Sequence, residues 1–186
     1  MIAKIMRVLT LPPIVTGFTI VFLFSTHNDI SVVELYLLFV CLVVFPLLAY
    51  PFREVFKIGN DRRQGQRSVA MIFSVISYSY GYIWSLFSNA SMITKVFFSS
   101  YLISVIALLI INKILKYHAS GHACSTTAPL VLLGWQLGFW YMIIGIIFVG
   151  IVYFASLRLK RHTLLQLISG SSISVLAGFL SIIIYV

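Results

Sequence analysis

The chain has 186 residues, of which 61% are hydrophobic and 9% are charged, and its mean hydropathy is +1.07. A water-soluble domain carries about 25% charged residues, so the composition excludes an ordinary soluble domain and predicts a single integral-membrane domain over residues 1–186. The net charge of +9 does not indicate nucleic-acid binding, because the basic residues stand in short segments between apolar runs. In such places they act as topology signals and possible anion ligands.

Long apolar runs of about 18 residues or more predict transmembrane helices. In chain order, the apolar runs predict seven spans, at about 8–25, 32–52, 68–88, 93–115, 122–136, 139–157 and 164–186. The fifth is short for a hydrocarbon core of about 30 Å, so this part of the chain holds either two spans with a turn at 134–138 or one broken helix. The predicted fold is all-α, a polytopic transmembrane helix bundle of about seven spans, or of six plus a broken helix.

Three short segments hold most of the polar residues that could carry chemistry. They are the arginine-rich segment 53–67, the histidine segment 117–122 and the segment 156–166. Two predicted spans separate the first from the second, and two more separate the second from the third, so all three lie on one side of the membrane with the N-terminus. Among the thirteen Lys and Arg residues, Lys95 alone falls on the other side, and the positive-inside rule predicts a cytoplasmic N-terminus and site.

The third polar segment contains His162, which follows Arg158, Lys160 and Arg161 and begins the seventh predicted span. Neighbouring cations favour the neutral form of an imidazole, and the neutral form can act as a nucleophile. Gln166 lies four residues further on, on the same face of a helix, and can orient the imidazole. An interfacial histidine among snorkelling basic side chains is the alternative explanation.

The histidine segment contains Ser120, Gly121 and His122 at the start of the fifth predicted span. Small residues ahead of a helix expose backbone N–H groups, and the N-terminus of a helix favours an anion. Ser120 adds a hydroxyl, and His122 could donate a proton to a leaving oxygen. His118 could also face this site. A Ser-Gly-His tripeptide is common by chance, so a plain packing role is the alternative.

The arginine-rich segment contains Asp61, Arg62, Arg63 and Arg67. A guanidinium group donates paired hydrogen bonds that suit phosphate oxygens. The alternative explanation is that these charged residues only set the topology of the chain in the membrane. The phosphate interpretation gains weight because the three segments occur together, on one predicted face.

This ordered set resembles the type-2 phosphatidic acid phosphatase superfamily. Members have a basic motif (Lys, six residues, Arg-Pro), then Pro-Ser-Gly-His, then Ser-Arg, five residues, His, three residues and Asp. Residues 120–122 match the second motif, with Ala119 where proline is usual, and His162 matches the third-motif histidine. Residues 161–166 are similar to a divergent prokaryotic branch that has Arg-His-Thr-x-x-Gln, and residues 61–67 are similar to the first motif of that branch. The resemblance covers about residues 50–175, the phosphatase-like core.

The resemblance implies a membrane-embedded phosphatase that needs no metal and no cofactor. It implies that His162 attacks phosphorus and that His122 protonates the leaving group. The expected substrate is a lipid phosphate or an isoprenoid diphosphate, and its tail stays in the lipid bilayer. The expected phosphate-binding residues are Arg62, Arg63, Arg67, Ser120, Gly121 and Arg158, supported by Gln166 and Asp61.

The chain departs from the family pattern at four further positions. Ser68 stands where proline is usual, Asn60 where lysine is usual, Ser156 where arginine is usual and Gln166 where aspartate is usual. A histidine without its carboxylate partner loses charge stabilisation, so a binding site can persist where catalysis is feeble. The alternatives are a non-catalytic protein of the same fold that binds or transports lipid phosphates, and a structural membrane protein whose basic loops only set topology.

Overall fold

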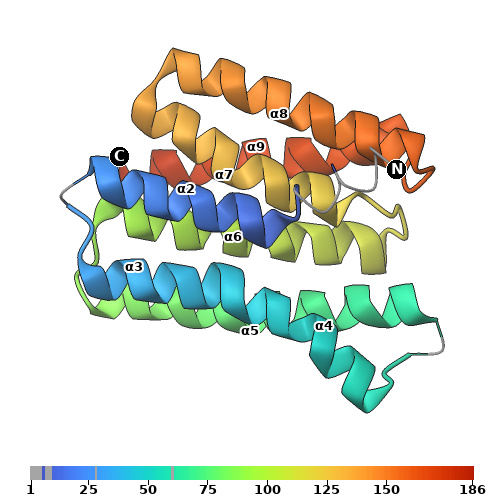
Figure 1. Cartoon of the computed structure of the whole chain (residues 1–186). Helices are drawn as coiled ribbons and strands as arrows, with labels where there is room; N and C mark the ends of the chain where they lie inside the picture. The colour runs from blue at the N-terminus through green and yellow to red at the C-terminus, as the bar shows by residue number, and fades with distance from the viewer. Residues whose placement is uncertain (1–5, 7–9, 28, 60) are drawn as a thin grey trace.

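The computed structural model describes residues 6, 10–27, 29–59 and 61–186, and these residues form a helical bundle (Figure 1). In the described part of the chain there are no strands and seven helical segments, which confirms the predicted all-α bundle. The segments are α2 (Pro12–Thr26), the continuous helix of α3 (Val32–Phe39), the π-helical turn η1 (Val40–Val44) and α4 (Phe45–Phe56), α5 (Arg62–Phe87), α6 (Met92–Leu109) with the π-helical turn η2 (Ile110–Ile114), α7 (Gly121–Leu137), α8 (Phe139–Arg158) and α9 (Leu164–Tyr185).

Five of the described helices are long and apolar enough to cross a membrane. They are Val32–Phe56, Gln64–Phe87, Met92–Ile114, Phe139–Arg158 and Leu164–Tyr185, and they make the chain an integral membrane protein. The other two helices are shorter, because α2 has 15 residues and α7 has 17. At 1.5 Å per residue these two reach only about 22 and 25 Å, less than a hydrocarbon core of about 30 Å. The prediction of about seven helices is confirmed for the described residues. Five of these helices, and not all seven, have the full length of a membrane span.

The second helix bends near the boundary of α3 and α4 (Figure 1). The π-helical turn η1 lies at this boundary, and Pro46 follows it. A proline has no N–H for the carbonyl four residues earlier, and π-helical turns are a common cause of helix kinks. The helix nevertheless continues through Pro51 to Phe56, four residues beyond the predicted end of this span.

The interior of the bundle is built around α6, which packs against α5 on one side and α9 on the other. Its side chains Val96, Phe97 and Phe98 are almost completely buried. The short helix α7 packs against α8, α9 and α2. Helix α7 is therefore held among three other helices.

The three polar segments lie at one end of the bundle (Figure 1). That end holds the turn between α4 and α5, the loop between η2 and α7, and the turn between α8 and α9, as the parity of the predicted spans requires. A side chain caps α5, α7 and α9, which begin there. Asp61 accepts a hydrogen bond from the Gln64 N–H, Ser120 from the Ala123 N–H and Thr163 from the Gln166 N–H.

Candidate functional site

A backbone hydrogen bond joins the second polar segment to the third. The N–H of Ser120 donates to the carbonyl oxygen of Gln166, at 2.9 Å. Gly170 lies one helical turn further along α9, and a Cβ atom there would lie 3.1 Å from the Ser120 carbonyl carbon and would overlap its oxygen. The absence of a side chain at Gly170 thus lets the start of α7 rest directly on the first turns of α9.

His162 is half-buried, and its Nδ1 lies 3.1 Å from Oε1 of Gln166, the partner that the spacing of four residues predicts. The same oxygen accepts the backbone N–H of Thr163 at 3.2 Å, as part of the capping box that begins α9. A backbone N–H can only donate, so this atom is the amide oxygen and not the amide nitrogen. Nδ1 of the neutral imidazole therefore carries the proton, and the lone pair lies on Nε2.

His122 lies in the first turn of α7 and is half-buried. Its carbonyl oxygen accepts the Thr126 hydroxyl at 2.7 Å. Gly121 precedes it, and an added Cβ there would meet no atom within 4 Å. The first N–H groups of a helix point toward its N-terminal end, so open space at Gly121 is compatible with an approaching anion.

Ser120 is fully buried, and its Oγ accepts the N–H of Ala123 at 3.3 Å. The hydroxyl thus caps α7 in this structure, and its contact with a phosphate stays a prediction. His118 is exposed and has a φ of 67°. Its Nδ1 lies 2.9 Å from the carbonyl oxygen of Lys116, which holds the ring against its own loop.

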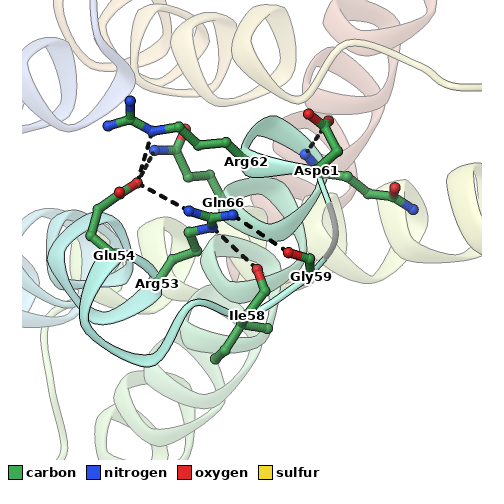
Figure 2. Close-up of polar contacts among 8 residues, drawn as sticks. Arg53, Glu54, Ile58, Gly59, Asp61, Arg62 and Gln66 are labelled. Atoms are coloured by element: carbon green, nitrogen blue, oxygen red, sulfur yellow. Dashed lines mark hydrogen bonds and ion pairs between the residues drawn. The ribbon is translucent and has the colours of Figure 1, made fainter.

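The arginine-rich segment forms a separate polar network around Glu54 (Figure 2). Nε of Arg62 donates to Oε1 of Glu54 at 3.0 Å, and Nε2 of Gln66 donates to the same oxygen at 3.1 Å. Nη1 of Arg53 lies 3.5 Å from this oxygen. The Arg62 side chain is 70% exposed, so this pair is a surface ion pair that a phosphate could replace.

Arg53 also shapes the turn that precedes α5 (Figure 2). Its Nε donates to the carbonyl oxygen of Ile58 at 3.1 Å, and its Nη2 donates to that of Gly59 at 3.5 Å. Gly59 has a φ of 82°, a conformation that glycine adopts without strain. Neither Glu54 nor Arg53 was predicted as part of the site. The signal that could have indicated them is the proximity of one of only four acidic residues to the arginine cluster.

The predicted site residues fall into two groups in the structure. His162, Gln166 and Ser120 are joined by the hydrogen bonds described above, at the contact of α7 with α9. Arg62 is bonded to Glu54, on a helix that packs against α4 and α6. Among the remaining residues, Asp61 caps α5, Arg67 and Arg158 are exposed on α5 and α8, and the side chain of Arg63 lies outside the described part of the structure.

Ser156 occupies the position at which the family pattern has arginine, and it is buried, with 1% of its surface exposed. This position therefore faces the interior of the bundle, and Arg158, two residues further on, is exposed at the end of α8. In the described ranges, no three His, Cys, Asp or Glu side chains lie together where they could hold a metal ion.

Comparison with known proteins finds no family model that matches the chain, and no curated protein or solved structure that is significantly similar to it.

Proposed function

We propose that the chain is a membrane-embedded phosphatase that removes phosphate from a lipid phosphate or an isoprenoid diphosphate through a phosphohistidine on His162. The observation that supports this best is the hydrogen bond from Nδ1 of His162 to Oε1 of Gln166. In the neutral imidazole this bond assigns the proton to Nδ1, so Nε2 is the nitrogen whose lone pair can attack phosphorus. The bond from Ser120 to the Gln166 carbonyl oxygen adds support, because it holds the helix start with His122 beside the same residue.

The proposed reaction has two steps. Nε2 of His162 attacks the terminal phosphorus in line, the bond from phosphorus to the leaving oxygen breaks, and His122 donates a proton to that oxygen. Water then attacks the phosphohistidine and releases inorganic phosphate, so no oxidant or metal takes part. The developing negative charge is met by the N–H groups at Gly121 and by the guanidinium groups of Arg62, Arg63, Arg67 and Arg158. Arg62 has to exchange its Glu54 partner for phosphate in this scheme.

We propose further that the N-terminus and the site face the cytoplasm, in the cell membrane. By the order of the predicted spans, twelve of the thirteen Lys and Arg residues flank them on the side of the polar segments. Cytoplasmic loops are enriched in these residues, whereas Lys95 is the single basic residue of the other side.

A second candidate function is the binding or transport of lipid phosphates without hydrolysis. Two observations favour it. The Gln166 amide supplies no negative charge to a developing imidazolium, and Ser156 is buried where the family pattern has a phosphate-binding arginine. Replacement of the aspartate by its amide in a serine protease triad lowers kcat about 10⁴-fold, so an amide in this position is compatible with very slow turnover.

The test is release of inorganic phosphate from prenyl diphosphates and phosphatidic acid by the protein in lipid vesicles. Removal of the nucleophile in His162→Ala should abolish release, and removal of the proton donor in His122→Ala should lower it about 10²- to 10⁴-fold. His118→Ala is the matched control, because that histidine is exposed and bonded to its own loop, and its rate should match wild type.

The remaining outcomes separate the alternatives. Equal release by wild type, His162→Ala and His122→Ala would contradict the catalytic function. Thermal stabilisation by lipid phosphate without hydrolysis would support the binding protein. If neither is observed, the basic loops serve topology alone.

A further inference from the structure

The face that α2 shares with the second helix contains an apolar groove of about 480 Å³. One wall is α2 from Pro13 to Ser25, and the other is formed by Phe39, Val43 and Leu47. Ser25 is the one polar residue among the described residues that line it, and its hydroxyl donates to the Phe22 carbonyl oxygen at 2.7 Å. The groove thus presents hydrocarbon along its whole length.

The depth of the groove comes from a close approach of the two helices at Gly17. An added Cβ at Gly17 would lie 3.4 Å from a ring carbon of Phe39 and 3.6 Å from Val43. Phe18 and Val21 border the groove and are 77% and 53% exposed. In an integral membrane protein, such an exposed apolar surface at the depth of the spans meets lipid.

We propose that this groove binds one hydrocarbon tail of a membrane lipid whose phosphate head lies at the basic end of the bundle. The groove runs for about 18 Å along α2, from Pro13 to Ser25, which is close to the thickness of one leaflet of the hydrocarbon core, about 15 Å. The groove is lined by apolar side chains over this length, which suits a single extended hydrocarbon tail.

The direction of the tail follows from the charges. Pro13 and Leu47 lie at the end of the groove toward the polar segments, and α4 continues from Leu47 to Arg53 and Glu54. Exposed basic residues of that end include Lys57, Arg62 and Lys116. Anionic heads are attracted to such a surface. A second copy in the same membrane orientation would instead bring two basic ends side by side, and each chain carries a net charge of +9.

The position of the head rests on the proposed function, whereas the binding of the tail does not. The two are separated by a photocrosslinking experiment that needs no turnover. The photoreactive amino acid p-benzoylphenylalanine replaces Phe18 in the groove or, as the matched control, Ile147, which is 61% exposed on α8. Each protein is irradiated in phosphatidylcholine vesicles with increasing hexadecyl phosphate, hexadecanol or inorganic phosphate, and the adducts are identified by mass spectrometry.

We expect a hexadecyl phosphate adduct at position 18 that saturates with concentration, and only non-saturating bulk-lipid adducts at position 147. The bulky side chain in Val21→Trp should fill the groove and lower the apparent affinity about tenfold, whereas Ile147→Trp should not. Both positions face lipid, so neither variant should impair folding.

Each remaining result has a defined meaning. Saturation by hexadecanol as well as by hexadecyl phosphate would support binding of the tail in the groove and would contradict recognition of a phosphate head at the basic end. This result can occur whether or not the chain is a phosphatase. Adducts at positions 18 and 147 that behave alike would overturn the proposal. An adduct with a second copy, or with the chain's own residues 1–9, would overturn it in favour of that occupant.

Discussion

Gln166 makes hydrogen bonds to three different residues with its side chain and its backbone. Oε1 accepts from Nδ1 of His162 and from the N–H of Thr163, and its carbonyl oxygen accepts from the N–H of Ser120. One residue therefore fixes the tautomer of the proposed nucleophile, begins α9 and holds the start of α7. Gln166 is a positioning residue, since it acts on the reaction only through His162 and Ser120.

We expect Gln166→Glu to raise the rate of phosphate release at least about tenfold, because a carboxylate stabilises the positive charge that develops on the His162 imidazole as Nε2 attacks phosphorus. Glutamate also completes a capping box, so α9 should begin at the same residue. The rate measured at saturating substrate checks this, together with its pH profile, which a purely structural role would not change.

Gln166→Ala is the companion variant. It removes the acceptor of both side-chain bonds, so it should lower the rate and also lower the free energy of unfolding by about 1 kcal/mol. An unchanged rate in both variants would show that Gln166 does not orient the nucleophile.

At the residue scale, local spacing alone could predict the pair of His162 and Gln166, because residues four apart share one face of a helix. The bond from Arg62 to Glu54 could not be predicted in this way. Eight residues and a helix break at 57–61 separate the two, so their distance depends on how the turn folds and not on helical periodicity. The same holds for the burial of Ser120, whose environment is supplied by another helix.

At the element scale, the crossing of α7 and α9 depends on Gly170. An added Cβ there meets the backbone of Ser120 and the backbone nitrogen of Cys124, which cannot yield as a flexible side chain can. Ser174 lies one turn further on, and its hydroxyl donates to the carbonyl oxygen of Cys124. The two helices are thus in backbone contact over about one turn.

Gly170→Ala should lower the free energy of unfolding by about 1–3 kcal/mol and should weaken phosphate-dependent thermal stabilisation, because the start of α7 has to move away from α9. Gly150→Ala is the matched control. It adds the same methyl group to α8, where no atom lies within 4 Å, and it should be neutral or stabilising by up to about 1 kcal/mol. Thermal unfolding in detergent micelles measures both, and equal stability of the two variants would show that the crossing is not as tight as described.

Most of the helices could be predicted from apolar runs and their flanking polar residues, and the turn predicted at 134–138 occurs at Gly138. The π-helical turns η1 and η2 could not be predicted. A π-helical turn has no characteristic residue type, and η1, the apolar stretch Val40–Val44, continues the apolar sequence of the α-helix before it. Their position reflects the packing of neighbouring helices, which hydropathy does not contain.

At the scale of the whole molecule, the two cysteines are suited to a test of sidedness. Cys41 and Cys124 are buried, with 2% and 1% of their surfaces exposed. The wild-type protein should therefore not react with a membrane-impermeant maleimide. Labelling of an introduced cysteine can therefore be measured without replacing Cys41 and Cys124.

Gln64→Cys and Asn89→Cys lie at opposite ends of α5, one beside the arginines and one in the turn before α6. In intact cells, we expect labelling at position 89 and protection at position 64, which should react only after the membrane is permeabilised. This pattern follows from the positive-inside rule. The reverse pattern would place the site on the extracytoplasmic side, and equal labelling of both would contradict an odd number of crossings between them.

The bond from Ser120 to Gln166 has a consequence for motion. Since α7 and α9 are fastened together at the polar end, a ligand cannot enter by separating their first turns without loss of that bond and of the contact at Gly170. Arg62 and Glu54 are fastened to each other instead, on α5 and α4. The exchange of the Glu54 partner of Arg62 for a ligand, which the proposed reaction requires, therefore breaks no contact between α7 and α9.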